Sequence, residues 1–368
     1  MIRIDNLRMT YRSSAAEHQA VKGVSLEVGQ GQFYTLLGPS GCGKTTTLRC
    51  VAGLERPDTG EITVGNEVVF SADRNVWVSP NNRNIGMVFQ SYAIWPHMTV
   101  FDNVAFPLRH QKPRPSRGTI REKVMNALQL VQLNGLQDRP APFLSGGQQQ
   151  RLALARALVA EPRVLLLDEP LSNLDAKLRE EMRLELRDLV KRLNVTTLFV
   201  THEQIEALTM SDRIAVMNDG LIVQEGAPLE IYSAPHHAFV ADFIGKTNFL
   251  KGKVAALDGS TGRARRAQVE TSIGVLSCRV ASEARQSDSV TVAVRPENVE
   301  LTRGSAAQKD NAVAGEVESV VYLGNLLDCS VKVGDEHIRV QLHPSQSLAR
   351  GEKVALRFPS EHCLVMTT

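Results

Sequence analysis

The sequence predicts an α/β protein with a parallel core sheet and an antiparallel β subdomain, followed by a separate all-β domain. Strands that are buried on both faces of a parallel sheet read as continuous apolar runs, each followed by a helix. Such runs, each followed by a helical pattern, occupy residues 33–37, 164–167 and 195–200. The alternation of apolar and polar residues that is typical of half-buried antiparallel strands occurs at residues 2–4, 24–28 and 61–70.

The helical patterns and the change of character along the chain predict its division into domains. The clearest helix is expected at residues 176–193, where leucine and methionine recur every three or four positions. A stretch punctuated by proline, ending in a second helical pattern over 120–133, predicts a helical subdomain at about residues 91–160. Near residues 233–250 the helical periodicity disappears, and short β-rich runs follow after Lys251. We therefore expect a first domain over residues 1–240 and a second, β-rich domain over 241–368.

Composition and charge exclude several classes of protein. The chain of 368 residues carries 42 Lys plus Arg against 40 Asp plus Glu, which disfavours a protein that wraps a polyanion. No uninterrupted apolar run exceeds four residues, whereas a membrane span needs about 20. The N-terminus lacks the apolar region of a secretory signal, so we expect a cytoplasmic location. The five cysteines show no CxxC spacing, which argues against a disulfide framework or a structural zinc site.

The strongest functional motif is the segment 38–45, GPSGCGKT, which matches the phosphate-loop pattern G-x-x-x-x-G-K-[ST]. It lies between a predicted strand and a predicted helix, which is the context that the motif requires. Glycines let backbone N–H groups close around phosphate oxygens, and the start of the helix adds partial positive charge. We therefore predict a nucleotide site in which Lys44 reaches the β and γ phosphates and Thr45 ligates Mg²⁺. Cys42, close to Lys44, is expected to have a lowered pKa and a reactive thiolate.

Two carboxylates, Asp168 and Glu169, follow the apolar run 164–167. The carboxyl ends of strands form the edge at which open α/β sheets bind ligands. Asp168 suits a magnesium ligand, and Glu169 suits a base that polarises attacking water. Taken alone, such a pair is more often a helix cap. Together with the phosphate loop, it favours a catalytic role.

The segment 144–151, LSGGQQQR, predicts the start of another helix. Ser145 is a plausible N-cap, and Gly146 and Gly147 leave bare amides at the positive end of the helix. This gives a second anion site in a chain that has one phosphate loop. The alternative is an ordinary capped helix with a permissive entry.

In their order and rough spacing, these motifs resemble those of the ATPases of ABC transporters, over about residues 1–240. The further segments that carry the resemblance are SNLD at 172–175, MVFQ at 87–90 and VTH at 200–202. The C-terminal part resembles the oligonucleotide-binding (OB)-like regulatory domain of importer ATPases for maltose, polyamines and ferric iron. That second resemblance depends on FVADFIG at 239–245 and AVRPEN at 293–298.

The resemblance implies a role for several single residues. Tyr11 would stack on adenine; the less favoured alternative is one more aromatic residue packed against the β subdomain. Gln90 would sense the γ-phosphate and Mg²⁺ and relay to membrane subunits. His202 would contact the γ-phosphate, and Asp175 would couple two sites across a dimer. The implied catalytic residues are Gln90, Glu169 and His202, and the implied magnesium ligands are Thr45, Gln90 and Asp168. The implied ATP-binding residues are Tyr11, Gly38, Ser40, Gly41, Cys42, Gly43, Lys44, Thr45, Thr46, Ser145, Gly146, Gly147, Gln148, Asp168 and Asp175.

The resemblance also implies partners, a location and a use. The chain would be the ATP-hydrolysing subunit of an import complex, a homodimer on the cytoplasmic face of the inner membrane. It would bind two integral membrane permease subunits and act indirectly with a periplasmic or extracellular solute-binding protein. The wording SYAIWPHMTV at 91–100 is most similar to the ferric-iron branch, so iron transport is the expected use. Polyamine, phosphonate or sugar uptake are the alternatives.

A rival from another class is a nucleic-acid ATPase of the structural-maintenance or repair type, which shares these ATP motifs. Such proteins place long coiled coils between the phosphate loop and LSGGQ, whereas here 100 residues without sustained heptads separate Thr45 from Ser145. Residues 245–368 hold 16 Lys plus Arg against 14 Asp plus Glu, and from 250 onward the aromatic residues are Tyr322 and Phe358. Neither a basic groove nor a stacking platform is visible. We therefore expect no nucleic-acid partner.

Overall fold

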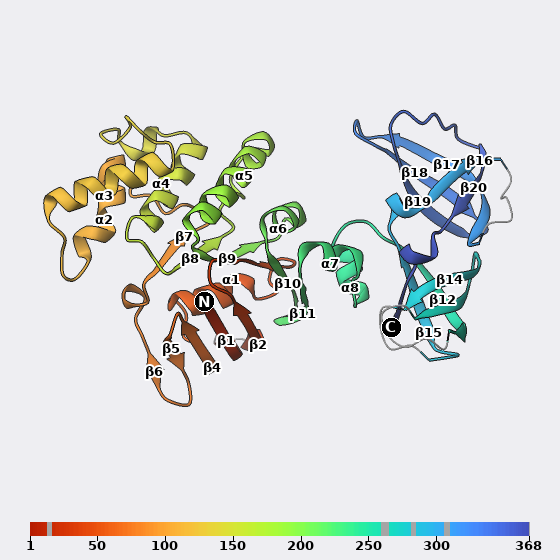
Figure 1. Ribbon diagram of the computed structural model, residues 1–368, viewed down its shortest axis with the longest axis horizontal. Helices are drawn as coiled ribbons and strands as arrows, with labels where there is room; N and C mark the ends of the chain where they lie inside the picture. The colour runs from red at the N-terminus through yellow and green to blue at the C-terminus, as the bar shows by residue number, and fades with distance from the viewer. Residues whose placement is uncertain (13–16, 259–264, 281–284, 305–309, 368) are drawn as a thin grey trace. The chain divides into compact units, whose positions relative to one another are not determined.

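A computed structural model describes residues 1–12, 17–258, 265–280, 285–304 and 310–367 (Figure 1). The chain divides into two compact units, Met1–Pro228 and Leu229–Thr368. No helix among the described residues is long and apolar enough to cross a membrane.

The core of the first unit is a six-stranded sheet in the order β11-β10-β3-β9-β8-β7. All neighbours pair in parallel except β10 and β11, which form an antiparallel hairpin. Every residue of β3, β8 and β9 is buried, which confirms the prediction of strands covered on both faces. The strands are β3 (Phe33–Leu37), β7 (Ile85–Val88), β8 (Val164–Asp168), β9 (Thr196–Thr201), β10 (Arg213–Asn218) and β11 (Leu221–Gly226).

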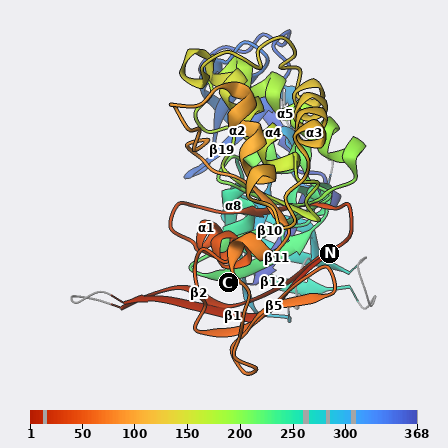
Figure 2. The same cartoon turned by 90° about the vertical axis from the view of Figure 1, so that its left-hand side faces the viewer.

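An antiparallel sheet in the order β2-β1-β4-β5-β6 forms the predicted β subdomain. Its strands β1 and β2 make a long two-stranded ribbon (Figure 2). The buried faces of β1, β2 and β4 share one apolar core with helix α1 and with the core sheet. The strands are β1 (Ile2–Arg12), β2 (Glu17–Val28), β4 (Thr59–Val64), β5 (Glu67–Ser71) and β6 (Val76–Trp77).

Helices α2, α3, α4 and α5 each begin directly after a residue whose side chain caps the helix: Thr99, Ser116, Ser145 and Asp175. Helix α5 has the bounds that the leucine pattern predicts, and Asp175 caps its start. Helices α2, α3 and α4 pack on one another and form the predicted helical insertion (Figure 1). The helices are α1 (Lys44–Ala52), α2 (Val100–His110), α3 (Arg117–Leu130), α4 (Gly146–Leu158), α5 (Ala176–Leu193) and α6 (Gln204–Met210).

The second unit is β-rich, as predicted. Strands β12, β13, β14, β21 and β15 close a barrel, and a five-stranded sheet has the order β16-β20-β17-β18-β19. The barrel strands are β12 (Asn248–Leu257), β13 (Arg266–Thr271), β14 (Gly274–Val280), β15 (Ser289–Val294) and β21 (Leu364–Thr367). The sheet strands are β16 (Glu300–Arg303), β17 (Ala312–Tyr322), β18 (Leu327–Val333), β19 (Glu336–Leu342) and β20 (Lys353–Arg357).

The boundary between the units lies earlier than the expected residue 240. Helices α7 (Pro228–Ser233) and α8 (Ala238–Phe243) precede the barrel. The buried Arg295 ties both helical segments to it, because its guanidinium donates to the carbonyl oxygens of Tyr232 at 3.2 Å and Ala241 at 2.9 Å. The division therefore falls directly after Pro228, the first residue of α7.

Candidate functional site

The residues predicted to handle phosphate lie along one edge of the core sheet, because four neighbouring parallel strands end there. The phosphate loop follows β3 and Gln90 follows β7. Asp168 is the last residue of β8, and His202 directly follows β9. The order β3-β9-β8-β7 places these chain segments next to one another although more than 160 residues separate the first from the last.

The phosphate loop has a backbone that requires glycine. Gly43 has a φ of 100°, and a Cβ there would lie 2.3 Å from the carbonyl oxygen of Ala20. Helix α1 begins at the next residue, Lys44, so the first amides of the helix point toward the loop. The buried Lys44 ammonium donates to the carbonyl oxygens of Gly38 at 2.8 Å and Pro39 at 2.9 Å. The arrangement gathers N–H donors and one cation, which suits an anion such as a phosphate chain.

A hydroxyl and a carboxylate meet beside the loop. Thr45 Oγ1 donates to Asp168 Oδ1 at 3.0 Å. Burial raises the pKa of Asp168, and the hydrogen bond from Thr45 partly offsets that shift. Hydroxyl and carboxylate oxygens are ligands that Mg²⁺ prefers, so the residues present fit this ion. No group of three or more His, Cys, Asp or Glu among the described residues is placed to hold a metal. Magnesium at this position would therefore need phosphate oxygens or water as further ligands.

Glu169 lies at the centre of the site. Its φ of 45° is left-handed, and its backbone N–H donates to the carbonyl oxygen of Val200 at 3.0 Å. Its Oε2 accepts a hydrogen bond from Gln90 Nε2 at 3.2 Å and lies 3.1 Å from His202 Nδ1. The carboxylate is thus held from two sides by residues of two other strand ends. Such a fixed carboxylate can accept a proton from water.

Sequence analysis missed two residues that hydrogen-bond to segments of the site, Asn173 and Glu206. Asn173 Nδ2 donates to the backbone oxygen of Gln90 at 2.6 Å. Behind His202, the hydroxyl of Thr201 donates to the buried Glu206 at 2.6 Å, and burial raises the pKa of Glu206. Asn173 lies inside the SNLD segment, so its motif was visible. Nothing in the sequence signalled the partner of Thr201.

Of four other predicted site residues, three have their contacts outside this cluster, and the fourth, Tyr11, contacts the start of α1. Ser145 and Gln148 cap each other at the start of α4, with distances of 3.0 and 3.4 Å. This geometry fits the ordinary-cap alternative and leaves the proposed anion site untested. Asp175 accepts from the backbone N–H of Leu178 at 3.0 Å as the cap of α5. The Tyr11 hydroxyl is 3.4 Å from Thr46 Oγ1, which places its ring near the start of α1.

The expectation of a lowered pKa at Cys42 is wrong. The thiol is buried, and burial raises its pKa more than the nearby Lys44 lowers it. Lys44 Nζ donates to Cys42 Sγ at 3.8 Å as well as to the two loop carbonyls. This contact with Lys44 offsets part of the shift in pKa that burial causes, and the net direction is upward.

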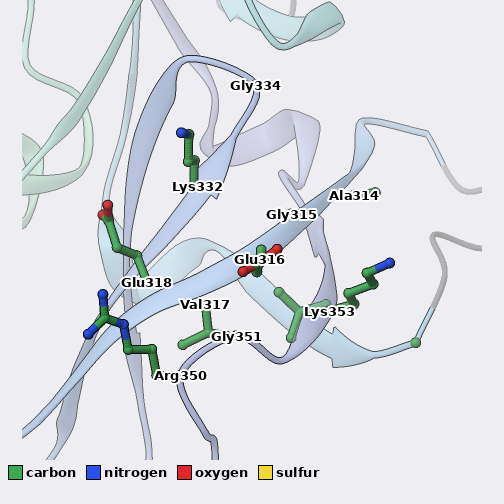
Figure 3. Close-up of a pocket in the computed structure, with 12 residues that line it drawn as sticks. Ala314, Gly315, Glu316, Val317, Glu318, Lys332, Gly334, Arg350, Gly351 and Lys353 are labelled. Atoms are coloured by element: carbon green, nitrogen blue, oxygen red, sulfur yellow. The ribbon is translucent and has the colours of Figure 1, made fainter.

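The second unit has a groove of about 1030 Å³ of its own (Figure 3). Charged side chains from three strands line it: Glu316 from β17, Lys332 from β18 and Lys353 from β20. Glycines form part of its wall, and Glu318 in the lining is engaged by His337 at 2.8 Å. None of the site residues predicted from the sequence lies in this groove.

The fold and the site define the chain as a phosphate-loop ATPase with an additional β domain. The model of the ABC transporter family matches residues 21–172, and that of the TOBE domain matches residues 292–366. A spermidine/putrescine import ATP-binding protein of Rubrobacter xylanophilus is 44% identical over 99% of this chain and 93% of its own length. A trehalose/maltose import ATP-binding protein of Thermococcus litoralis is 55% identical over 64% of this chain and 63% of its own length.

A solved dimeric ATP-binding cassette, in a post-hydrolysis state with ADP and Pi, is 31% identical with a TM-score of 0.54. The match covers 62% of this chain and 99% of that one. The chain belongs to the ABC transporter family, as an ATP-binding subunit of the importer type with a C-terminal OB-like domain. It binds ATP and is an ATPase coupled to transport.

Thiol labelling tests whether the buried Cys42 has a raised pKa and therefore a slow reaction with maleimide. All five cysteines are buried, and burial raises the pKa of Cys42 and, to about 12, that of Cys50. Treatment of the native protein with maleimide at pH 7 is expected to label less than about one thiol per chain rapidly, because thiolate is the reactive form. After unfolding in guanidinium, all five thiols are expected to react. A single fast thiol that maps to Cys42 and is protected by Mg-ATP would restore the original expectation.

Proposed function

We propose that the chain works as a two-fold homodimer in which each phosphate loop faces the partner's α4. The observation that supports hydrolysis at this edge of the sheet is the carboxylate of Glu169, which Gln90 and His202 hold in place. The chain has one phosphate loop but two helices that start at glycines: Gly43 precedes Lys44, and α4 begins at Gly146, where the capping box of Ser145 and Gln148 occupies the amide of Gln148. A two-fold arrangement pairs each loop with the other chain's α4 and makes two identical sites. The similar cassette that holds ADP and Pi was solved as a dimer.

In this dimer, the loop amides and Lys44 would bind the phosphates of ATP, and Thr45 and Asp168 would hold Mg²⁺. The ion would neutralise phosphate charge, which is most of what phosphoryl transfer requires of a protein. Glu169 would orient water and accept its proton, while Gln90 and His202 keep the carboxylate in place. The amides at the start of the partner's α4 would close the site. Because ATP would bind the closed dimer better than the open one, binding would shift the dimer toward closure.

The partners of the dimer would be two integral membrane permease subunits on the cytoplasmic side of the inner membrane. A periplasmic or extracellular solute-binding protein would deliver the solute without touching this chain. The names of the relatives support this assembly, because both are import ATP-binding proteins.

The proposed solute is a polyamine such as spermidine or putrescine. The spermidine/putrescine relative matches this chain over both units, whereas the trehalose/maltose relative matches about two thirds of it. A sugar is the second candidate. Neither relative supports the ferric-iron expectation, which depended on the wording of a ten-residue segment.

Replacing the catalytic carboxylate tests the site. Glu169→Gln is expected to lower kcat by roughly 10²- to 10⁴-fold, because the amide cannot accept a proton while ATP binding is preserved. The variant should form an ATP-trapped dimer on size exclusion. Glu67→Gln, an exposed carboxylate on β5, is the matched control and should turn over like the wild type. Unchanged turnover of Glu169→Gln, together with monomer alone in ATP, would remove the role given to Glu169.

Uptake measurements test the solute. In the source organism, deletion of the gene should abolish uptake of labelled putrescine or spermidine and leave uptake of labelled maltose and ferric iron intact. The wild-type chain should restore uptake, and Lys44→Ala should not, because it lacks the cation of the phosphate loop. Loss of maltose or iron uptake with normal polyamine uptake would contradict the assignment.

A further inference from the structure

The chain directly after Gln90 has an unfavourable backbone. Tyr92 and Ala93 have φ values of 62° and 47°, so two consecutive residues with side chains are left-handed. This region costs energy for any residue that carries a Cβ, and adjacent pairs are uncommon. Tyr92 is buried, while Ala93 is exposed. Something in the surrounding structure must hold this conformation.

Arg156 holds it. Its Nη2 donates to the carbonyl oxygen of Tyr92 and its Nη1 to that of Ala93, both at 2.7 Å. The guanidinium also lies over the ring of Trp95, 4.6 Å from the centroid. Arg156 is 8% exposed, so these contacts satisfy a charge that is nearly removed from water. One side chain thus fixes three of the four residues from Tyr92 to Trp95.

The same helix carries the predicted anion site at its other end. Arg156 is in the last turn of α4, and Ser145 caps the first turn. Eleven residues of α-helix span about 16 Å, and a helix of this length moves as one body. A displacement at Ser145 would therefore reach the carbonyls of Tyr92 and Ala93.

The segment is also tied to the catalytic carboxylate. The backbone oxygen of Gln90 accepts from Asn173, and the side chain of Gln90 donates to Glu169. The buried Asn103 of α2 binds the backbone of Trp95 from the other side, with its Oδ1 accepting at 3.0 Å and its Nδ2 donating at 3.1 Å. The segment 90–95 therefore connects α4 with Glu169 through the hydrogen bonds of Arg156 and Gln90 and the short stretch of backbone between them.

We propose that Arg156 is a positioning residue that couples the phosphate-binding end of α4 to Gln90 by holding the left-handed backbone of Tyr92 and Ala93. The inference rests on the proposed function, since it is the partner's nucleotide that would engage Ser145. When that end of α4 moves onto the nucleotide, Arg156 carries the movement to Gln90 and thus to Glu169. Arg156 itself touches neither substrate nor reacting atoms.

Steady-state kinetics of Arg156→Met test the proposal, because methionine fills the space but donates no hydrogen bond. We expect kcat to fall by roughly tenfold or more, since Gln90 is misplaced. KM for ATP should stay within about twofold, because Lys44 and Thr45 are untouched. Glycine adopts left-handed backbone at little cost, so Ala93→Gly added to Arg156→Met should recover at least about threefold of the lost kcat.

A matched control separates positioning from a purely structural role. Arg151→Met removes another arginine of α4, which donates to the carbonyl oxygen of Val131 and to Glu185. Any loss of kcat or melting temperature in Arg151→Met should not be recovered when Ala93→Gly is added. Ala93→Gly alone should turn over like the wild type. A wild-type kcat in Arg156→Met would overturn the proposal. So would a double variant in which Ala93→Gly restores the melting temperature but not kcat.

A second measurement leaves Arg156 in place, in case its variants do not fold. The chain has two tryptophans, so Trp77→Phe leaves Trp95, beneath Arg156, as the sole reporter. A non-hydrolysable ATP analogue with Mg²⁺ should change Trp95 emission, and Ser145→Arg should remove at least about half of the change although the analogue still binds. Dimer formation is read by size exclusion on the same samples. If dimers form but Trp95 emission does not change, the coupling is rejected while the proposed function stands. The same holds if Ser145→Arg shows the same emission change as the chain with Ser145. If no dimers form, the proposed function itself is rejected.

Discussion

The arrangement of four parallel strands is the constraint on which the rest of the structure depends. Leu37 at the end of β3 pairs with Thr201 of β9, and Asp168 at the end of β8 pairs with Val200. The strands therefore end at one level, and each delivers its polar residue to the same edge. A slip in register would separate the phosphate loop from the carboxylates. The full burial of these strands favours that register, because the polar residues Asp168, Gln90 and His202 come after the buried apolar runs.

Burial of polar groups at this edge explains why each has a fixed partner. A charge or carboxylate removed from water is costly unless it is hydrogen-bonded. Lys44 is satisfied by two loop carbonyls, and Asp168 by the hydroxyl of Thr45. The left-handed Glu169 is fixed by the backbone of β9 and by its neighbours. The site is therefore preorganised by the protein itself, and the binding of phosphate would replace contacts that the loop already makes.

Much of the fold and of the candidate site could be predicted from the sequence, because the signals for them are local. The bounds of α5 follow from its leucine spacing and its Asp175 cap, and the buried parallel strands follow from their apolar runs. Cys42 was predicted wrongly, since sequence shows the neighbouring Lys44 but not the burial that outweighs it. The role of Arg156 was invisible because its partners are backbone carbonyls 63 and 64 residues away. The boundary was predicted too late in the chain for the same reason, because Arg295 holds α7 and α8 through backbone carbonyls 54 and 63 residues away.

The central claim is that two chains share each ATP site, and mixing two defective chains tests it most directly. Lys44→Ala and Ser145→Arg chains carry distinguishable tags and are each inactive alone. In a shared arrangement their heterodimer has one site with both lesions and one intact site, so it should occlude one ATP per dimer. A mixture of the Lys44→Ala/Ser145→Arg double variant with wild type leaves neither shared site intact and should occlude none. Occlusion in verified heterodimers no higher than in either single variant would contradict the shared site.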